Sequence, residues 1–127
     1  MQALDIAKTM NSPKVFYDKG LNILSISGDS YPENSFEFYK PLFKWMNMFV
    51  DSNLDSLQID FTLVYFNSTT SKVLYDFFDL LEEHSGTNLR LKVNWQYDPE
   101  NELALESGEE YHEDYESLSI NLVPLQA

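Results

Sequence analysis

The sequence predicts an α/β fold, a single domain in which a mixed β-sheet carries helices packed mainly on one face. Over residues 58–65 apolar and polar side chains alternate, as in a strand with one buried face, and residues 73–81 then change to apolar residues at helical spacing. Residues 88–97 alternate again, so this helix joins two strands. Because such crossovers are right-handed, the helices gather on one side of the sheet, and the alternation leaves the other side partly solvated.

The preceding residues supply a hairpin and a first helix. Residues 14–18 and 21–27 are two short β-rich runs with turn-forming residues between them, and residues 28–35 have the composition of a loop. The helix that follows contains Pro41, which cannot donate a helical hydrogen bond. Either the regular helix starts near Lys40, with Pro41 in its first turn, or a short turn precedes a kink, and we expect the first.

The last third of the chain completes the order of the elements. Gly86 is placed to end the second helix, and a third, acidic helix opens at Asp98 and reaches about residue 113. A last strand passes through the alternate apolar residues Leu118, Ile120 and Leu122. The predicted order is β-β-α-β-α-β-α-β in one domain of residues 1–127, with residues 1–12 expected to be a poorly ordered or loosely packed N-terminal segment.

The chain is strongly acidic. It has 8 Lys and Arg against 21 Asp and Glu, a formal net charge of −13, which argues against binding nucleic acid or an anionic membrane. It has no cysteine, so disulfides and thiolate metal sites are excluded. No apolar run approaches the about 18 to 20 residues that span a bilayer. The N-terminus also lacks the pattern of a signal peptide, and we expect a cytoplasmic protein.

A hydroxyl-rich run, Asn67-Ser68-Thr69-Thr70-Ser71, lies where the central strand turns into the second helix. The N-terminus of a helix has unpaired N–H groups and a partial positive charge, so a phosphoryl group on one of these hydroxyls would be well placed. The alternative is that the run only caps the helix. Lys72, one turn into the helix, is either a local counter-charge for a phosphate or an ordinary exposed lysine.

The loop before the first helix is rich in residue types that are enriched in interfaces. Tyr31 and Phe36 either form an exposed docking patch or close the end of the core, whereas Glu33 and Asn34 are expected to face a partner or to cap the helix. The candidate switch and partner-binding residues are Tyr31, Glu33, Asn34, Asn67, Thr69, Thr70 and Lys72.

Other chemistry is weakly represented in the sequence. There is no Gly-rich phosphate-binding motif, and Ser68 has no histidine close to it in sequence. His84 is expected at a helix end, and His112 lies in the acidic run with no second histidine nearby, so no metal site is predicted. We expect a protein without a cofactor that is not an enzyme.

Four blocks of the sequence resemble one family. Residues 28–38, which begin Gly-Asp-Ser-Tyr-Pro-Glu-Asn-Ser, resemble the signature loop of the SiaC family of bacterial regulatory phosphoproteins. Residues 65–72 resemble that family's Tyr-x-Asn-(Thr/Ser)-x-(Ser/Thr)-x-Lys stretch, and residues 79–83 and 95–102 match two further blocks in the same order. The order of the elements also resembles a STAS-like domain, the fold of anti-sigma-factor antagonists.

The resemblance implies a phosphorylation-switched signalling protein. In the family the hydroxyl residue directly after the Asn at the helix mouth is phosphorylated, which is Ser68 here. The family often has Thr at this position, and Thr69 and Thr70 are rivals in the same run. A dedicated protein kinase adds the phosphate and a PP2C-type phosphatase removes it. The unphosphorylated protein binds and activates a diguanylate cyclase, which links it to cyclic-di-GMP and biofilm behaviour.

Two other functions remain open from the sequence. One is an anti-sigma-factor antagonist in a partner-switching transcription pathway, which has the same fold and the same phosphorylation logic. A remoter alternative is a small-molecule-binding or enzymatic domain.

Overall fold

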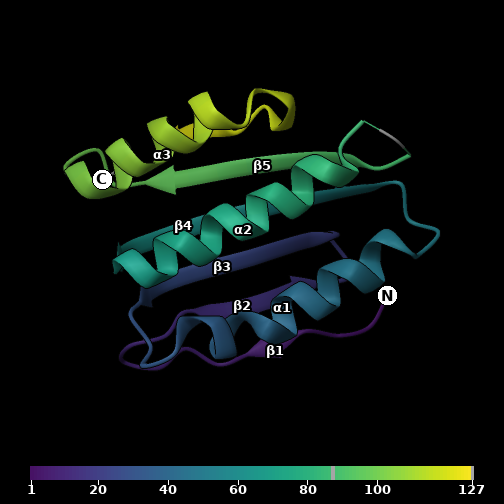
Figure 1. Cartoon of the computed structure of the whole chain (residues 1–127), viewed down its shortest axis with the longest axis horizontal. Coiled ribbons are helices and arrows are strands. Elements are labelled where there is room, and N and C mark those ends of the chain that lie inside the picture. Colours follow the sequence, from purple (N-terminus) through teal and green to yellow (C-terminus); the bar gives the residue numbers. More distant parts are fainter. Residues whose placement is uncertain (87, 127) are drawn as a thin grey trace.

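The computed structural model describes residues 1–86 and 88–126. Its elements follow the predicted order, with one additional short strand at the start (Figure 1). The strands are β1 (Asp5–Ile6), β2 (Lys14–Asp18), β3 (Ile23–Ser30), β4 (Ser56–Phe66), β5 (Arg90–Tyr97) and β6 (Asn121–Pro124). The helices are α1 (Ser35–Val50), α2 (Ser68–His84), α3 (Glu102–Asp114) and a short 3₁₀ helix, η1 (Glu116–Leu118).

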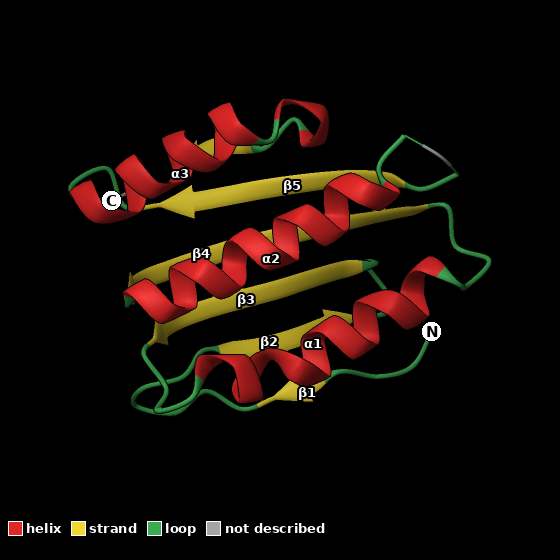
Figure 2. Cartoon of the chain, viewed as in Figure 1, coloured by secondary structure: helices red, strands yellow, loops and turns green. Residues whose placement is uncertain are grey.

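The strands form one mixed sheet in the order β1-β2-β3-β4-β5-β6. The pairs β1–β2 and β2–β3 are antiparallel, whereas β3–β4, β4–β5 and β5–β6 are parallel. The connections between the parallel strands contain α1, α2 and α3, and the three helices lie on the same face of the sheet (Figure 2). This confirms the predicted class, an α/β domain with a mixed sheet and helices on one face.

The core lies between the sheet and the helices and is rich in aromatic rings. Leu63 on β4 and Phe77 on α2 are 2% and 1% exposed, as the periodicity of each element predicts. The Phe77 ring centroid lies 5.4 Å from that of Phe43 on α1 and 6.2 Å from that of Phe61 on β4. These contacts join both helices to the middle of the sheet at the centre of α2.

The opposite face of the sheet is open and polar. Asp60 on β4 accepts hydrogen bonds from the side-chain amides of Gln58 and of Asn94 on β5, the latter at 2.9 Å. Thr62 donates to the Gln96 side chain at 2.6 Å. The polar side chains of the alternating strands therefore lie on this face, which is partly solvated as predicted, although Asn94 is only 8% exposed within the hydrogen-bond network.

The first helix starts earlier than predicted. It begins at Ser35 rather than near Lys40, and Pro41 lies inside it. Asn34 caps the helix, because its side chain accepts a hydrogen bond from the backbone N–H of Glu37. The buried residues of this helix, from Ser35 through Tyr39 to Phe49, lie on one face of it. Pro41 removes one helical hydrogen bond to the carbonyl of Glu37, an exposed residue whose carbonyl water can reach.

Three other boundaries also differ from the prediction. β3 continues to Ser30, past the expected start of the loop, and its pairing with β4 shifts register at Gly28, which has a φ of 115°. α3 starts at Glu102, because the side chain of Asn101 caps it after a turn, and not at Asp98. The last strand is shorter than predicted and lies later, since Leu118 belongs to η1.

Residues 1–12, for which the sequence predicted loose packing, contact the domain at several points. Leu4 is 9% exposed and belongs to the core, and its carbonyl accepts a hydrogen bond from the Tyr17 N–H at 2.9 Å. The Trp45 indole donates to the carbonyl of Gln2 at 2.8 Å. The segment also provides β1, which pairs with β2 at the edge of the sheet.

Among the helices in residues 1–86 and 88–126, none combines the length and the hydrophobicity that a transmembrane span requires.

Candidate functional site

The predicted site residues lie at one end of the molecule. The parallel strands end there, and α1, α2 and α3 all begin there (Figure 1). Each helix is capped by an asparagine, Asn34, Asn67 or Asn101, whose side-chain oxygen accepts the backbone N–H three residues further on at 2.9 to 3.1 Å. We call this end of the molecule the switch end.

Ser68 is the first residue of α2, directly after its cap Asn67. The side chains of Ser68 and Thr69 are exposed, whereas Asn67 is half-buried. The cap bond at 2.9 Å runs from the Thr70 N–H to the Asn67 side chain, so the hydroxyl of Ser68 is not needed as the cap. The hydroxyl of Ser68 is therefore exposed on the first turn of a helix, where backbone N–H groups lack a partner within the helix.

Thr70, two residues further on, is fully buried. Its hydroxyl donates to the Ser30 carbonyl at 3.0 Å and lies 2.9 Å from the Ser30 hydroxyl and 3.1 Å from the Ser35 hydroxyl. The Tyr39 hydroxyl lies 2.7 Å from that of Ser30. We call Ser30, Ser35, Tyr39 and Thr70 the hydroxyl cluster. It joins the end of β3 to the first turns of both α1 and α2.

The hydroxyl cluster is uncharged. Burial raises the pKa of Tyr39 to about 12, partly offset by its hydrogen bond with Ser30, so the phenol stays protonated at neutral pH. The hydrogen bonds of the cluster join the end of β3 to both helices and so help to position them.

Lys72 is exposed one turn after Ser68, and its ammonium nitrogen lies 5.9 Å from the ring centroid of Phe36 on α1. Phe36 itself is 45% exposed. A cation over an aromatic face at this distance is attracted by the ring, with a contribution of about 0.5 to 1 kcal/mol at an exposed site. Sequence reasoning placed Lys72 near a phosphate but missed its contact with Phe36, since the two residues come from different helices.

Tyr31 lies against Tyr65, with ring centroids 5.7 Å apart in an edge-on arrangement. The two residues are 38% and 49% exposed, and Glu33 and Asn34 beside them are exposed as well. Tyr31 is thus on the surface and does not close the core. Sequence reasoning did not single out Tyr65 because its place at the end of β4 looked like the continuation of a buried phase.

Apolar surface is concentrated at the switch end. Of the ten large hydrophobic side chains that the described residues expose, six lie at the switch end, near the end of a parallel strand or in the first turn of a helix: Tyr31, Phe36, Val64, Tyr65, Leu103 and Leu125. Solitary exposed apolar residues are ordinary, but a concentration of them at one end of a molecule is typical of an interaction surface.

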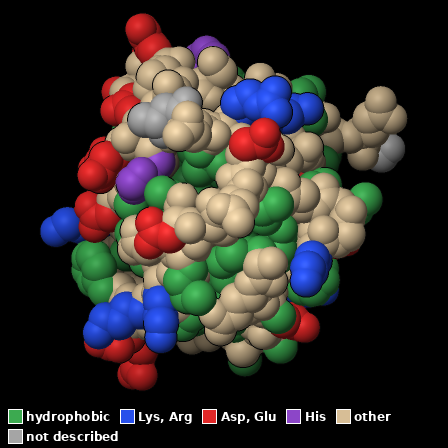
Figure 3. Space-filling model, turned by 90° about the vertical axis from the view of Figure 1, so that its right-hand side faces the viewer, with side chains coloured by type: hydrophobic (Ala, Val, Ile, Leu, Met, Phe, Trp, Pro, Cys, Tyr) green, Lys and Arg blue, Asp and Glu red, His purple; other side chains and the backbone are tan. Residues whose placement is uncertain are grey.

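The opposite end of the molecule has a different character. A hollow of about 510 Å³ lies there at the amino ends of β4 and β5, lined by residues that include Leu21, Gln58 and Arg90. Figure 3 shows hydrophobic side chains in the middle of this end with charges of both signs around them. None of the site residues predicted from the sequence lines this hollow.

Residues 1–86 and 88–126 contain no group of three or more His, Asp or Glu side chains that could hold a metal ion. One ring nitrogen of His112, Nδ1, lies 2.7 Å from the Ile120 carbonyl and thereby links α3 to the start of β6.

The strand order, the helices on one face and the exposed hydroxyls at the start of α2 define a small α/β domain with an accessible site for modification at a helix N-terminus. A family model described as SiaC family regulatory phosphoprotein matches residues 6–125. The chain therefore belongs to the SiaC family of regulatory phosphoproteins.

Individual relatives agree with this assignment. The chain is 36% identical over 114 residues to an uncharacterized protein of Pseudomonas aeruginosa strain UCBPP-PA14, covering 90% of each chain. It is similar to the crystal structure of apo-SiaC from Pseudomonas aeruginosa, with a TM-score of 0.86 and 35% identity over 97% of this chain and 99% of that one. It is equally similar, at a TM-score of 0.86, 35% identity and 96% and 99% coverage, to a chain in the structure of the diguanylate cyclase SiaD in complex with its activator SiaC from the same organism.

Proposed function

We propose that this protein is a phosphorylation-controlled activator that, in its unphosphorylated form, binds a diguanylate cyclase and thereby raises cyclic-di-GMP and favours biofilm formation. The observation that carries the proposal is that exposed apolar side chains and the exposed hydroxyl of Ser68 lie at the same end of the molecule, so a phosphate on Ser68 would lie close to a partner docked there. The relative solved in complex with a cyclase supports the choice of partner.

Ser68 is the proposed phosphorylation site. Its hydroxyl is exposed, as a kinase requires, and Ser68 follows the cap residue, so backbone N–H groups of the first turn can donate hydrogen bonds to phosphate oxygens. Thr69 is exposed too and remains a rival, whereas the buried, hydrogen-bonded hydroxyl of Thr70 makes it the weaker candidate. A phosphate adds about −1.5 to −2 charges, which on an acidic protein acts chiefly by repelling or displacing a docked partner.

The remaining roles follow from this switch. A dedicated protein kinase adds the phosphate and a PP2C-type phosphatase removes it, while the chain itself catalyses no reaction. A cyclase that uses GTP places the complex in the cytoplasm. Tyr31, Glu33, Asn34, Asn67, Thr69 and Lys72 form the partner-binding surface around Ser68, together with Phe36 and Tyr65.

The test is purification from the host followed by phosphosite mapping and identification of the bound protein. We expect phosphate on Ser68 and a diguanylate cyclase bound only to the unphosphorylated form. Ser68→Ala should fold normally and hold the cyclase even when the kinase is present, whereas the neighbouring control Thr69→Ala should still release it.

Two results would count against the proposal. If Ser68→Ala still released the cyclase and carried phosphate on Thr69 or Thr70, the phosphorylation site would be one of those two residues and not Ser68. Recovery of an anti-sigma factor in place of a cyclase would make the protein an antagonist in a transcription pathway.

A further inference from the structure

A shallow groove runs between α1 and α2 on the outer side of the helix layer. It has a volume of about 300 Å³ and is lined by Phe36, Lys40 and Phe43 of α1 and by Val73 and Asp76 of α2. The two helices lie side by side across the sheet, so the groove follows their axes (Figure 1). We call it the α1–α2 groove. It starts beside Lys72, one turn from Ser68.

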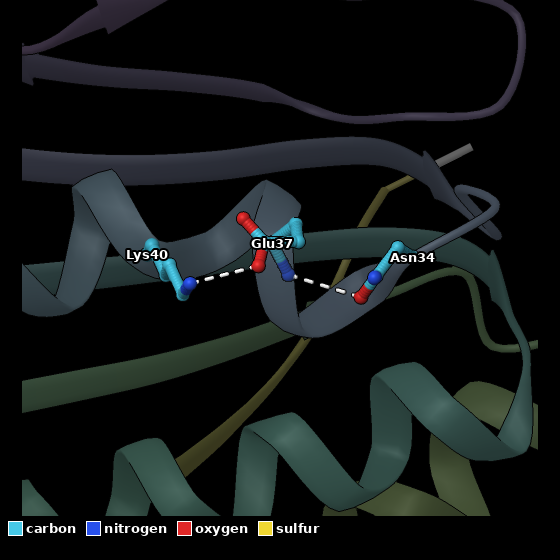
Figure 4. Close-up of polar contacts among 3 residues, drawn as sticks. All are labelled: Asn34, Glu37 and Lys40. Carbon is cyan, nitrogen blue, oxygen red and sulfur yellow. Dashed lines mark hydrogen bonds and ion pairs between the residues drawn. The ribbon is translucent and has the colours of Figure 1, made fainter.

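The groove has an apolar floor and charged residues of both signs, Lys40 and Asp76, along its rim. The rings of Phe36 and Phe43 and the side chain of Val73 supply the floor. Lys40 lies on the α1 side, where its ammonium group pairs with Glu37 at 2.7 Å (Figure 4). Both partners of this pair are more than 60% exposed, so it contributes little and can be exchanged for another acid.

The occupant that fits this groove is a helix. A ridge of side chains spaced three and four residues apart packs into the channel between two helices, and apolar anchors at that spacing would meet the phenyl rings of the floor. An extended segment would gain no backbone hydrogen bonds here, because both walls are helices whose N–H and C=O groups are already bonded.

The charged residues beside the groove further restrict which partner can occupy it. Lys40 and Lys72 are two of only 8 basic residues in a chain of net charge −13, and both lie along the groove. A second copy of the chain is a poor occupant, because it carries the same net charge, and its acidic helix α3 exposes one large apolar side chain, Leu103, and not a row of apolar anchors.

We propose that the α1–α2 groove receives an amphipathic helix of the partner whose apolar residues lie on Phe36 and Phe43 and whose acidic residues pair with Lys40 and Lys72. The proposal rests on the function proposed above. It adds how the partner binds and assigns to Lys72 the interaction with the phosphate. Residues four apart on a helix are neighbours, so a phosphate on Ser68 lies within reach of Lys72. The phosphate draws the Lys72 ammonium away from Phe36 and from the partner's acid.

The groove is tested by binding measurements with the host's purified diguanylate cyclase. Phe36→Ala, Lys40→Gln and Lys72→Gln all change exposed side chains. Phe36→Ala should weaken binding at least about tenfold, as truncation of an aromatic anchor does, and each lysine variant should weaken it severalfold. Leu21→Ala, an apolar residue 69% exposed at the opposite end, is the matched control and should bind as the wild type.

Crosslinking identifies the occupant directly. Since the chain has no cysteine, Asp76→Cys introduces a single thiol on the groove and Leu21→Cys one outside it. With a photoreactive maleimide, Asp76→Cys should crosslink to a cyclase segment with apolar residues at helical spacing and acidic flanks, and Leu21→Cys should not. Crosslinks between two copies of the chain would overturn the proposal.

The role of Lys72 is tested by the ratio of cyclase affinities before and after phosphorylation of Ser68. Lys72→Gln should lower this ratio at least about threefold, because the phosphate no longer has a lysine to displace, whereas Lys40→Gln should weaken binding without changing the ratio. Equal ratios in both variants would overturn the role of Lys72.

The outcomes separate this inference from the proposed function. If the phosphate releases the cyclase but the groove variants bind as tightly as Leu21→Ala, the switch stands and the groove is wrong. If the cyclase stays bound after phosphorylation while Asp76→Cys still crosslinks to it, the groove stands and the switch is wrong. If the wild-type chain binds no cyclase, both fail.

Discussion

Adjacent hydroxyl residues at the start of α2 have opposite environments. Ser68 and Thr69 are exposed, whereas Thr70 is fully buried and bonded to Ser30 and Ser35. The sequence predicted a hydroxyl-rich helix mouth but gave no means of separating these residues. The separation depends on residues 40 and 35 positions earlier in the chain, which only the packing of α1 and β3 against α2 brings together.

The hydroxyl cluster yields a prediction at the scale of one residue. Thr70→Val keeps the shape of the side chain but removes the hydroxyl that donates to the Ser30 carbonyl and pairs with the buried Ser35 hydroxyl. The Ser30 carbonyl still accepts the Asn67 N–H and the Ser30 hydroxyl still pairs with Tyr39, so Ser35 is the residue that loses its partner. The free energy of unfolding should fall by about 1 to 3 kcal/mol. Chemical denaturation checks this, with the exposed neighbour Thr69→Val as the control, expected within about 0.5 kcal/mol of wild type. Equal losses in the two variants would show that the cluster does not stabilise the fold.

At the scale of the elements, periodicity predicted which segments are helices and strands, and the caps decide where they begin. Asn34 and Asn101 set the starts of α1 and α3, against the expectations drawn from Pro41 and Asp98. Proline restricts the backbone locally, but an early start lets Tyr39 reach the hydroxyl cluster, a gain that no local signal reveals. The centres of the elements were therefore predictable and their boundaries were not.

The packing of α3 gives a prediction in which two effects oppose each other. Helix propensity favours Gly108→Ala by about 1 kcal/mol. A Cβ at this position, however, would lie 2.5 Å from Cδ1 of Trp95, whose buried indole is held by a hydrogen bond to the Ala104 carbonyl. Because the buried indole has no room to move, the steric clash should outweigh the gain in helix propensity. The free energy of unfolding should then fall by about 1 to 3 kcal/mol.

Thermal and chemical denaturation measure this change, and Glu109→Ala, the exposed next residue, serves as the control for helix propensity. A Gly108→Ala protein more stable than wild type would mean that α3 can move away from the sheet at little cost.

At the scale of the whole molecule, the sheet with helices on one face followed from the alternation and the crossovers. β1 did not, since its two residues become a strand only through pairing with β2. The switch end was predictable in part. The blocks that carry the family resemblance contain Tyr31 and Ser68, but the exposed apolar residues of the switch end also include Val64, Leu103 and Leu125, which lie outside these blocks. A surface assembled across the fold has no signature in any one stretch of sequence.

The tyrosine-rich core makes stability depend on alkaline pH. Burial raises the pKa of Tyr39 and of Tyr111 from 10.0 to about 12, and in both cases a hydrogen bond to a serine offsets part of the rise. Below pH 10 both the folded and the unfolded chain keep these protons. Between about pH 10 and 12 the unfolded chain loses them and the folded chain does not, so the free energy of unfolding falls as the pH rises, by about 1.4 kcal/mol per pH unit for each tyrosine.

Denaturation at a series of pH values from 9 to about 12 tests this with Tyr111→Phe, in which the slope above pH 10 should become shallower by about that amount. Deprotonating lysines makes an already acidic molecule more negative over the same range, and this background repulsion is shared by every variant. Phe43→Leu is therefore the control, because it weakens the packing against Phe77 without removing a titrating group and should lower the whole curve while keeping its slope. An unchanged slope in Tyr111→Phe would show that this phenol ionises as easily in the folded chain as in the unfolded one.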